Sequence, residues 1–241
     1  MEAYVTGPSD PNLANRVLAA LPHAEYERLL PRLKTVSLIV KQVMYEQNTP
    51  IKYVYFPFNA VVSEVAKMKN GQISEVTTIG NEGMLGTTVF LGSDRTPLAA
   101  FAQVAGQAAR MKASDLRAEI AQDGPLMKIL LRYTQGLMVQ IAQSGACNQL
   151  HSPKQRCARW LLMTHDRVGR DEFVLTQEFL CQMLGLRRAT VSEVASSMQR
   201  AGLIRYTRGR ISIIDRHALE TACCECYGVI CAEHGRMFAK K

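Results

Sequence analysis

The chain has 241 residues, a formal net charge of +8 and 47% hydrophobic residues. This is long and apolar enough for one large domain or two modest ones. No apolar run reaches the roughly 18 residues that a membrane span needs, and the N-terminal sequence MEAYVTGPSDPN lacks the basic and apolar regions of a secretory signal. None of the seven Cys precedes Cys147, and an odd number suits a reducing compartment better than a disulfide framework. We therefore expect a cytoplasmic protein.

The positive charge is concentrated in the C-terminal part of the sequence. From Ser152 onward there are 15 Lys and Arg against 9 Asp and Glu, a net charge of +6. Residues 1–151 contain 14 against 12, a net charge of +2. Attraction to a polyanion is therefore expected from the C-terminal part.

The first half of the chain is typical of short helices followed by many short strands. Residues 13–33 have helical spacing in pieces. Strand-like runs follow, with turn signals between them, at 36–40, 53–56, 61–68, 73–79 and 98–104. Asn70-Gly71 lies between two of these runs and is a strong hairpin signal. Many short strands at this spacing predict a sandwich or a jelly-roll-like barrel.

A long helix is predicted from Leu126 to Leu150, after a short helix through Ile120 that Ser114 caps. Along the long helix, positions at alternating spacings of three and four form a coiled-coil-like seam: Met127, Leu130, Thr134, Leu137, Ile141, Ser144 and Asn148. We expect this seam to form a dimer; packing against the chain's own strands is the alternative. Ser152, Pro153 and Gln155 then form a capping box that starts the next helix. This places a domain junction near His151.

The stretch from Leu175 to Ile214 has the pattern of two helices and a small two-stranded wing. Thr176 can cap the first helix and Gly185 can end it. The second helix has an apolar stripe at Val191, Val194, Ala195 and Met198, and strands are expected on both sides of the tip at 207–209. This arrangement is a winged helix-turn-helix, whose second helix can enter a DNA major groove.

The outer surface of this unit is rich in arginine. Residues 187–210 contain six Arg and a single acid, Glu193. The side chains of a kind that read bases or hold phosphates are Arg187, Arg188, Thr190, Ser192, Glu193, Arg205, Arg208 and Arg210. An ordinary helical hairpin with a solvated face is the alternative, but it has no need of a basic wing.

The order of a β-barrel, a long helix and a winged helix-turn-helix resembles the Crp/Fnr family of bacterial transcription regulators, over roughly residues 14–220. The resemblance is strongest in LTQEFLCQMLGLRRATVSEVASSMQRAGLI and next strongest in the GNEGMLG segment at 80–86. It implies an α+β fold with a jelly-roll-like barrel sensor at 1–123, a dimerisation helix at 124–151 and a winged helix-turn-helix domain at 152–241. It also implies a homodimer without enzymatic activity that binds double-stranded DNA at an inverted repeat, away from membranes, with RNA polymerase and a small-molecule effector as further partners.

The resemblance also assigns DNA contacts. Thr176 and Gln177 would contact phosphate, and the base-facing positions would be Arg188, Ala189, Ser192 and Glu193. Ala189 stands where the best-known members have Glu, and Glu193 stands where they have Arg. The familiar operator sequence is therefore not expected.

For the effector, the resemblance implies a pocket formed by Gly83, Leu85, Gly86, Thr87, Arg95 and Leu98. Members that bind cyclic nucleotides hold the ribose with a Glu after the Gly, and the phosphate with an Arg about ten residues later. Here Thr87 follows Gly86, and Pro97 and Leu98 stand where the Arg belongs, with Arg95 nearby. A buried phosphate without a cation is costly, so we expect no tight binding of cyclic AMP. The N-terminal Cys cluster of the oxygen-sensing members is also missing, and no cofactor is expected.

The C-terminal segment from Asp215 is predicted to be a helix rich in cysteine. Cys223 and Cys226 form a C-x-x-C, and Cys231 and His234 follow. A closed zinc site needs four ligands, which cannot converge from successive turns of one helix without a partner segment. We therefore expect no metal site and assign these cysteines to packing, with redox or metal chemistry as alternatives. The competing function is a redox- or ligand-sensing module whose C-terminal helices dock a protein rather than DNA.

Overall fold

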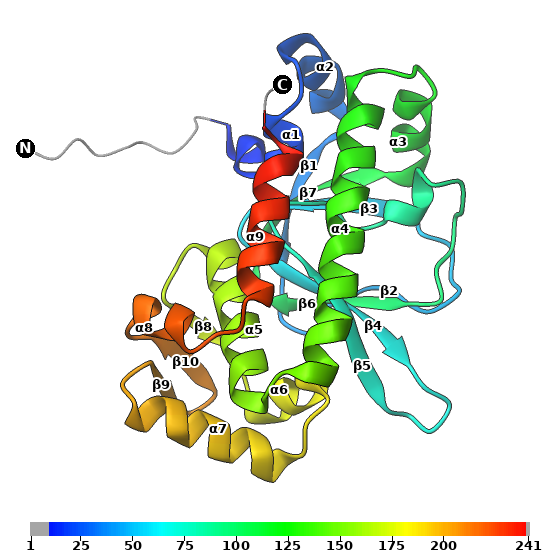
Figure 1. The fold of residues 1–241 in the computed structure, drawn as a ribbon. Coiled ribbons are helices and arrows are strands. Elements are labelled where there is room, and N and C mark those ends of the chain that lie inside the picture. The colour runs from blue at the N-terminus through cyan, green and yellow to red at the C-terminus, as the bar shows by residue number, and fades with distance from the viewer. Residues whose placement is uncertain (1–9, 240–241) are drawn as a thin grey trace, which may run out of the picture.

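The computed structural model describes residues 10–239. The first nine residues, which form most of the N-terminal segment without a secretory signal pattern, and residues 240–241 lie outside the described part. Within it, no helix combines the length and the hydropathy that a membrane crossing requires. The chain is arranged as an N-terminal pair of sheets, a long helix across them and a C-terminal helical unit with a small sheet (Figure 1).

The N-terminal part begins with short helices and continues as two antiparallel sheets. The helical segments are η1 (Pro11–Ala14), α1 (Arg16–Ala19), α2 (His23–Leu29) and η2 (Leu30–Arg32). The first sheet has the order β1 (Lys34–Leu38), β7 (Gly106–Lys112), β3 (Tyr53–Pro57). The second has the order β2 (Val43–Tyr45), β6 (Ala99–Val104), β4 (Val61–Lys67), β5 (Ile73–Ile79), and η3 (Thr87–Val89) lies between β5 and β6.

The expected α+β architecture is confirmed, but the sheets are separate rather than closed into a barrel. The β4–β5 hairpin turns at Asn70-Gly71, as predicted. Two strands were missed: β2 is only three residues long and exposes Val43, and β7 is made of small and charged residues rather than β-branched ones. Such segments are recognised as strands only when their neighbours are in place.

The core between the sheets is closed by the long helix α4 (Pro125–Leu150). Val54, Phe56, Ile79 and Met111 come from the two sheets, and Leu130 comes from α4. The preceding helix, α3 (Ala113–Ile120), begins after Lys112 without a side-chain cap, so the expected cap at Ser114 is wrong because Ser114 already lies in the first turn.

The C-terminal unit begins with α5 (Pro153–Val168), whose predicted capping box of Ser152 and Gln155 is present. It continues with β8 (Glu172–Val174), α6 (Gln177–Leu184), α7 (Arg188–Arg200), β9 (Ile204–Thr207) and β10 (Arg210–Ile213). The wing has a third strand, because β8 pairs with β10 in the order β8-β10-β9.

A second core joins this unit to the four-stranded sheet. Phe179 of α6 packs edge-on against Phe101 of β6, with ring centroids 5.8 Å apart. Val61 and Val65 of β4 belong to the same cluster as Trp160 of α5. The helix-turn-helix unit is therefore packed against the outer side of that sheet and is not tethered by α4 alone.

The cysteine-rich C-terminal segment is not one helix, so that prediction is wrong. It is divided into α8 (Arg216–Thr221) and α9 (Cys226–Met237), with a break at residues 222–225. Helix α9 runs back alongside α4 (Figure 1). The two helices approach closely at Gly136, where a Cβ atom would stand 2.3 Å from the Met237 sulfur.

Candidate functional site

The helix-turn-helix forms as its local signals predict. The Thr176 hydroxyl accepts a hydrogen bond from the Phe179 amide at 3.1 Å, and Gly185 ends α6 in the left-handed conformation at φ 61°. Val191, Ala195 and Met198 are buried along α7. The apolar stripe thus fixes which face of α7 remains outward.

The outward face of α7 carries the predicted base-reading groups. Arg187, Arg188, Ala189 and Glu193 are exposed, and Thr190 and Ser192 are half-buried. The Ser192 hydroxyl donates to Gln177 Oε1 at 3.1 Å, which ties α7 to the start of α6. Ser192 and Gln177 are therefore partly engaged with each other, while the exposed arginines at the start of α7 are free of packing.

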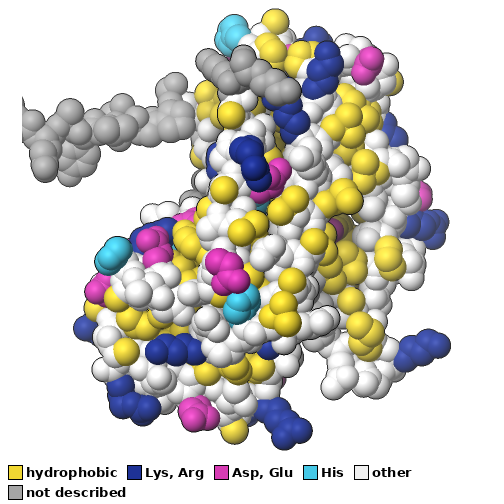
Figure 2. Space-filling model, in the orientation of Figure 1, with side chains coloured by type: hydrophobic (Ala, Val, Ile, Leu, Met, Phe, Trp, Pro, Cys, Tyr) yellow, Lys and Arg dark blue, Asp and Glu magenta, His cyan; other side chains and the backbone are white. Residues whose placement is uncertain are grey.

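The wing extends this surface. Arg205 and Arg208 are exposed, and Arg208 lies at the tip with φ 48°. Arg210 is exposed too, but its guanidinium pairs with Glu172 of β8 at 2.9 Å. Basic side chains lie along the lower edge of the molecule over α7 and the wing (Figure 2). The surface can therefore meet a phosphate backbone at two separated places.

The residues expected to form the effector pocket lie in different surroundings. Leu85 is buried and exchanges backbone hydrogen bonds with Tyr55. Gly83 lies under the ring of Tyr133, and Gly86 lies against Val54 at φ 98°. Thr87 and Leu98 are half-buried.

Arg95, the nearest candidate for the missing phosphate-binding Arg, is exposed on a loop and donates to the Asn48 carbonyl at 3.2 Å. The space between the sheets holds Tyr45 and Glu64, which are both buried and hydrogen-bonded to each other. Burial raises the pKa of the Glu64 carboxyl. An acidic side chain in this position gives a phosphate no cation to pair with.

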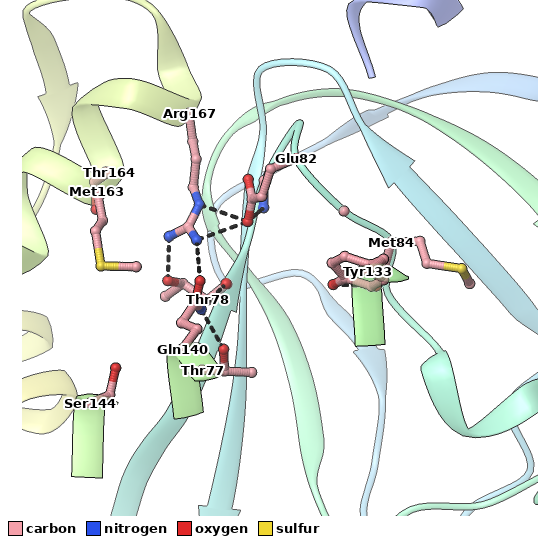
Figure 3. A network of polar contacts seen from close by, with 12 residues as sticks. Thr77, Thr78, Glu82, Met84, Tyr133, Gln140, Ser144, Met163, Thr164 and Arg167 are labelled. Atoms are coloured by element: carbon pink, nitrogen blue, oxygen red, sulfur yellow. Dashed lines mark hydrogen bonds and ion pairs between the residues drawn. The ribbon is translucent and has the colours of Figure 1, made fainter. Parts of the chain in front are cut away.

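A buried network that the sequence did not reveal links four parts of the chain (Figure 3). Arg167 of α5 pairs with Glu82 of the 80–86 segment, with Nη2 and Oε1 2.8 Å apart. The same guanidinium donates to Gln140 Oε1 of α4 at 3.0 Å and to Thr78 Oγ1 of β5 at 2.5 Å. Gln140 in turn donates to the Thr78 carbonyl at 2.8 Å.

This network is almost closed to solvent, since the Arg167 and Glu82 side chains are 4% and 6% exposed. Burial alone would raise the pKa of Glu82, but the Arg167 guanidinium, aided by His234, lowers it below its ordinary value. Gly80 is needed for the contact, because a Cβ there would lie 2.4 Å from the Arg167 side chain. Glu82 stands in the GNEGMLG segment, but no sequence pattern pointed to Arg167.

A pocket of about 230 Å³ adjoins the network. Glu82 and Asn81, Asp166 and Arg167, and His234 of α9 contribute to its lining. Glu82 Oε2 is buried there without a hydrogen-bond partner. The pocket thus lies where the 80–86 segment, α5 and α9 meet. The effector site expected at Gly83 to Leu98 involves other residues and stays a prediction.

The predicted dimer positions share one side of α4 but differ in their burial. Leu130 and Leu137 are buried in the core between the sheets, and Met127 and Thr134 are half-buried. Ser144 accepts from Arg159, and Asn148 accepts from Arg156. Ile141 is exposed. The seam therefore includes positions that pack within the chain, which was the alternative considered for it.

The outward stripe of α4 lies about one residue later. Leu131 is 48% exposed and Met138 is 66% exposed. Ala142 and Gly145 continue the stripe with exposed positions. These four residues follow spacings of seven, four and three, so they lie on one side of the helix, and hydrophobic side chains are visible along α4 (Figure 2).

Among residues 10–239, one group of side chains could hold a metal. Cys147 and His151 at the end of α4 meet Cys224 and Cys226 at the α8–α9 break, and their ligand atoms all lie within 4.8 Å of one another. No metal site was expected from the sequence, because the partner segment that α4 provides comes next to these cysteines only in the folded chain.

A family model described as a Crp-like helix-turn-helix domain matches residues 155–222. The segment at 155–222 is therefore similar to a Crp-like helix-turn-helix domain, and the comparison with solved structures concerns the fold. The fold is similar to that of FixK2 from Bradyrhizobium japonicum, with a TM-score of 0.65 and 18% identity over 80% of this chain and 98% of that one. No curated protein matches the sequence.

Two further solved structures have the same fold. A transcriptional regulator of the CRP family from Thermus thermophilus, TTHB099, has a TM-score of 0.61 and 19% identity, covering 78% of this chain and 95% of that one. CLP from Xanthomonas campestris, described as a c-di-GMP responsive global regulator, has a TM-score of 0.62 and 13% identity, covering 80% and 100%.

Proposed function

We propose that this Crp/Fnr-type chain is a homodimeric, sequence-specific regulator that binds an inverted repeat in duplex DNA. The observation that carries the proposal is the exposed face of α7, where Arg187, Arg188 and Glu193 are held outward by a buried stripe on the opposite side. Arg can pair with guanine and Glu can accept from cytosine in the major groove. The exposed Arg208 at the wing tip adds a second contact to the phosphate backbone.

The dimer in this proposal uses the outward stripe of α4. Leu131 and Met138 provide apolar area, and Ala142 and Gly145 let a second helix approach closely. Two copies joined along α4 would present two recognition helices, and the half-site centres would lie about one helical turn, ~34 Å, apart. Operator symmetry would then mirror the symmetry of the protein.

The regulatory input in this proposal is not a cyclic nucleotide bound between the sheets. The buried arginines among residues 10–239 are Arg159 and Arg167, both on α5 and neither between the sheets. Cyclic AMP and cyclic di-GMP both require cations for their phosphates. Calorimetry with each nucleotide is expected to show no binding at micromolar concentration; a micromolar dissociation constant would show that this part of the proposal is wrong.

The Arg167–Glu82 network supplies a route from the sheets to the DNA-binding unit. It joins the 80–86 segment, α4 and α5 in one set of buried hydrogen bonds. A change at the adjoining pocket would alter the packing of α5, which carries α6 and α7. This route is part of the proposal and is testable through variants of Glu82.

Selection from random duplex DNA tests the DNA-binding proposal. We expect enrichment of a symmetric motif with two half-sites, and gel filtration of the free protein should show a dimer. Affinity for the selected site should fall steeply with salt, because arginines release counterions from phosphates. A selection that enriches no symmetric motif would refute the proposal and would favour a protein partner for the C-terminal helices.

A further inference from the structure

The four side chains at the α4–α5 junction have the composition of a closed metal site. Cys147, Cys224 and Cys226 are 0%, 6% and 1% exposed, and His151 is the fourth group. Three Cys and one His are a common ligand set of structural zinc, which is bound tetrahedrally without an open position. We propose that these four residues bind one Zn²⁺ ion, which fastens the C-terminal segment to the end of α4.

The distances between the groups agree with a single ion. Zn–S bonds of about 2.3 Å and Zn–N bonds of about 2.0–2.1 Å give tetrahedral edges of about 3.8 Å between sulfurs and about 3.6 Å between sulfur and nitrogen. Cys147 Sγ and Cys224 Sγ are 3.5 Å apart, and Cys226 Sγ and His151 Nδ1 are 3.5 Å apart. An iron–sulfur cluster, whose ligands bind different iron atoms, needs a wider spacing.

The chain path explains how the ligands converge. Cys147 and His151 are four residues apart at the end of α4, so they lie on one side of it. Cys224 and Cys226 would point to nearly opposite sides of a continuous helix, because two residues correspond to about 200° of rotation. The break at 222–225 removes this restriction. The interruption of the C-terminal helix therefore places two ligands where an unbroken helix could not.

The surrounding groups fit an anionic centre. Three thiolates and one Zn²⁺ carry a net charge of −1. Arg159 is 5% exposed, and its Nε lies 3.3 Å from Cys147 Sγ. Its other hydrogen bonds within residues 10–239 go to Ser144 and Met163, and none goes to a carboxylate. A buried cation is costly without a counter-charge. The metal–thiolate group would supply one in direct contact, beside the Glu75 carboxyl with which Arg159 also interacts electrostatically.

Two outer contacts complete the site. Gln143 Nε2 donates to Cys226 Sγ at 3.1 Å, which stabilises a thiolate. His151 has Nδ1 directed at Cys226, while its Nε2 lies 3.3 Å from Glu225 Oε2. A ligating histidine commonly donates its second ring N–H to a carboxylate, which fixes the ring and its tautomer. Glu225 thus has the position of an outer partner of the metal.

The site lies at the junction between the long helix and the DNA-binding unit. His151 leaves the helical conformation at φ −106° and ψ 151°, and α5 begins two residues later. A bound ion would connect this junction to the loop before α9. It would hold α8 and α9 against α4 and α5. Without the ion, only packing would hold these helices together.

Metal analysis of the full-length protein tests the proposal. The chain is expressed with added zinc and purified under reductant without chelator. We expect about one zinc per chain, and cobalt substitution should give the intense absorption of a tetrahedral thiolate site. Cys224→Ser should retain less than about a tenth of the zinc, while Cys231→Ser, a half-buried cysteine of α9 outside the cluster, should retain all of it.

Glu225→Gln provides a second test in case the ligand variants do not fold. The Glu225 side chain is 73% exposed, so its replacement should not disturb packing. We expect it to fold and to bind zinc about 10–100-fold more weakly in a chelator competition. The proposal is overturned if the native chain takes up neither zinc nor cobalt, or if folded Cys224→Ser keeps its zinc. It is equally overturned if iron with acid-labile sulfide is found, or if a Cys147–Cys224 disulfide is present in protein alkylated directly from reducing cells.

Discussion

Glu82→Gln removes the negative charge from the buried network and keeps the side chain's size. The remaining Arg167 guanidinium, with a side chain 4% exposed, would then be buried without a counter-charge. Removing one partner of a buried ion pair costs about 3–5 kcal/mol. The amide oxygen can still accept hydrogen bonds from Arg167, so we expect the lower end of this range, about 3 kcal/mol less free energy of unfolding.

The chain contains a matched control for this change. Arg210 and Glu172 form an ion pair at a nearly identical distance, 2.9 Å, but with side chains 62% and 53% exposed. Exposed pairs contribute about 0–1 kcal/mol, so Glu172→Gln should change stability by less than about 1 kcal/mol. The two substitutions are chemically the same, and they differ in burial. The difference between their two losses of stability therefore measures the effect of burial on the ion pair.

Urea unfolding at one fixed protein concentration gives both values, since dimer formation makes stability depend on concentration. The double variant Glu82→Gln with Arg167→Met removes the uncompensated cation and should regain much of the loss. If Glu82→Gln loses no more stability than Glu172→Gln, the network does not stabilise the fold, and the reasoning from burial is refuted. An equal loss of stability in the single and double variants would instead show that changed packing, and not the unpaired charge, causes the loss.

The lowered pKa of Glu82 also makes the free energy of unfolding depend on pH. The stabilisation by Glu82 is present above its pKa in the unfolded chain and is lost as the pH falls through its lower pKa in the folded chain. Glu75 should give the opposite pH dependence, because burial raises its pKa to about 7 despite hydrogen bonds from Ser63 and Trp160. Its contribution to the free energy of unfolding is complete below about pH 4.5 and is lost as the pH rises to about 7. Glu75→Gln should therefore weaken the dependence of the free energy of unfolding on pH across that interval. Arg188→Ala should reduce discrimination between selected and altered operators by about 1–3 kcal/mol in competition binding, and unchanged discrimination would remove it from base reading. Met138→Asp should give monomers in sedimentation while leaving the circular dichroism spectrum intact, because its side chain is 66% exposed; a persisting dimer would place the interface elsewhere.

Local signals in the sequence determined the helix-turn-helix. Thr176 and Gly185 fixed the limits of α6, and Ser152 with Gln155 fixed the start of α5. These motifs act within one helical turn, so their effect does not depend on what the rest of the chain does. The β4–β5 hairpin followed in the same way from Asn70-Gly71. The short-range chemistry was sufficient for these helices, for this hairpin and for the exposed face of α7.

Tertiary structure alone decided which partner each apolar or polar group meets. The spacing of Leu130 and Leu137 shows that they share a side of α4, but only the packed fold shows that this side faces the chain's own sheets. Arg167 and Glu82 are 85 residues apart in sequence, and Cys147 and Cys224 are 77 apart. Periodicity extends over a few turns of one element, whereas burial of a charge or convergence of ligands depends on segments that meet only after folding.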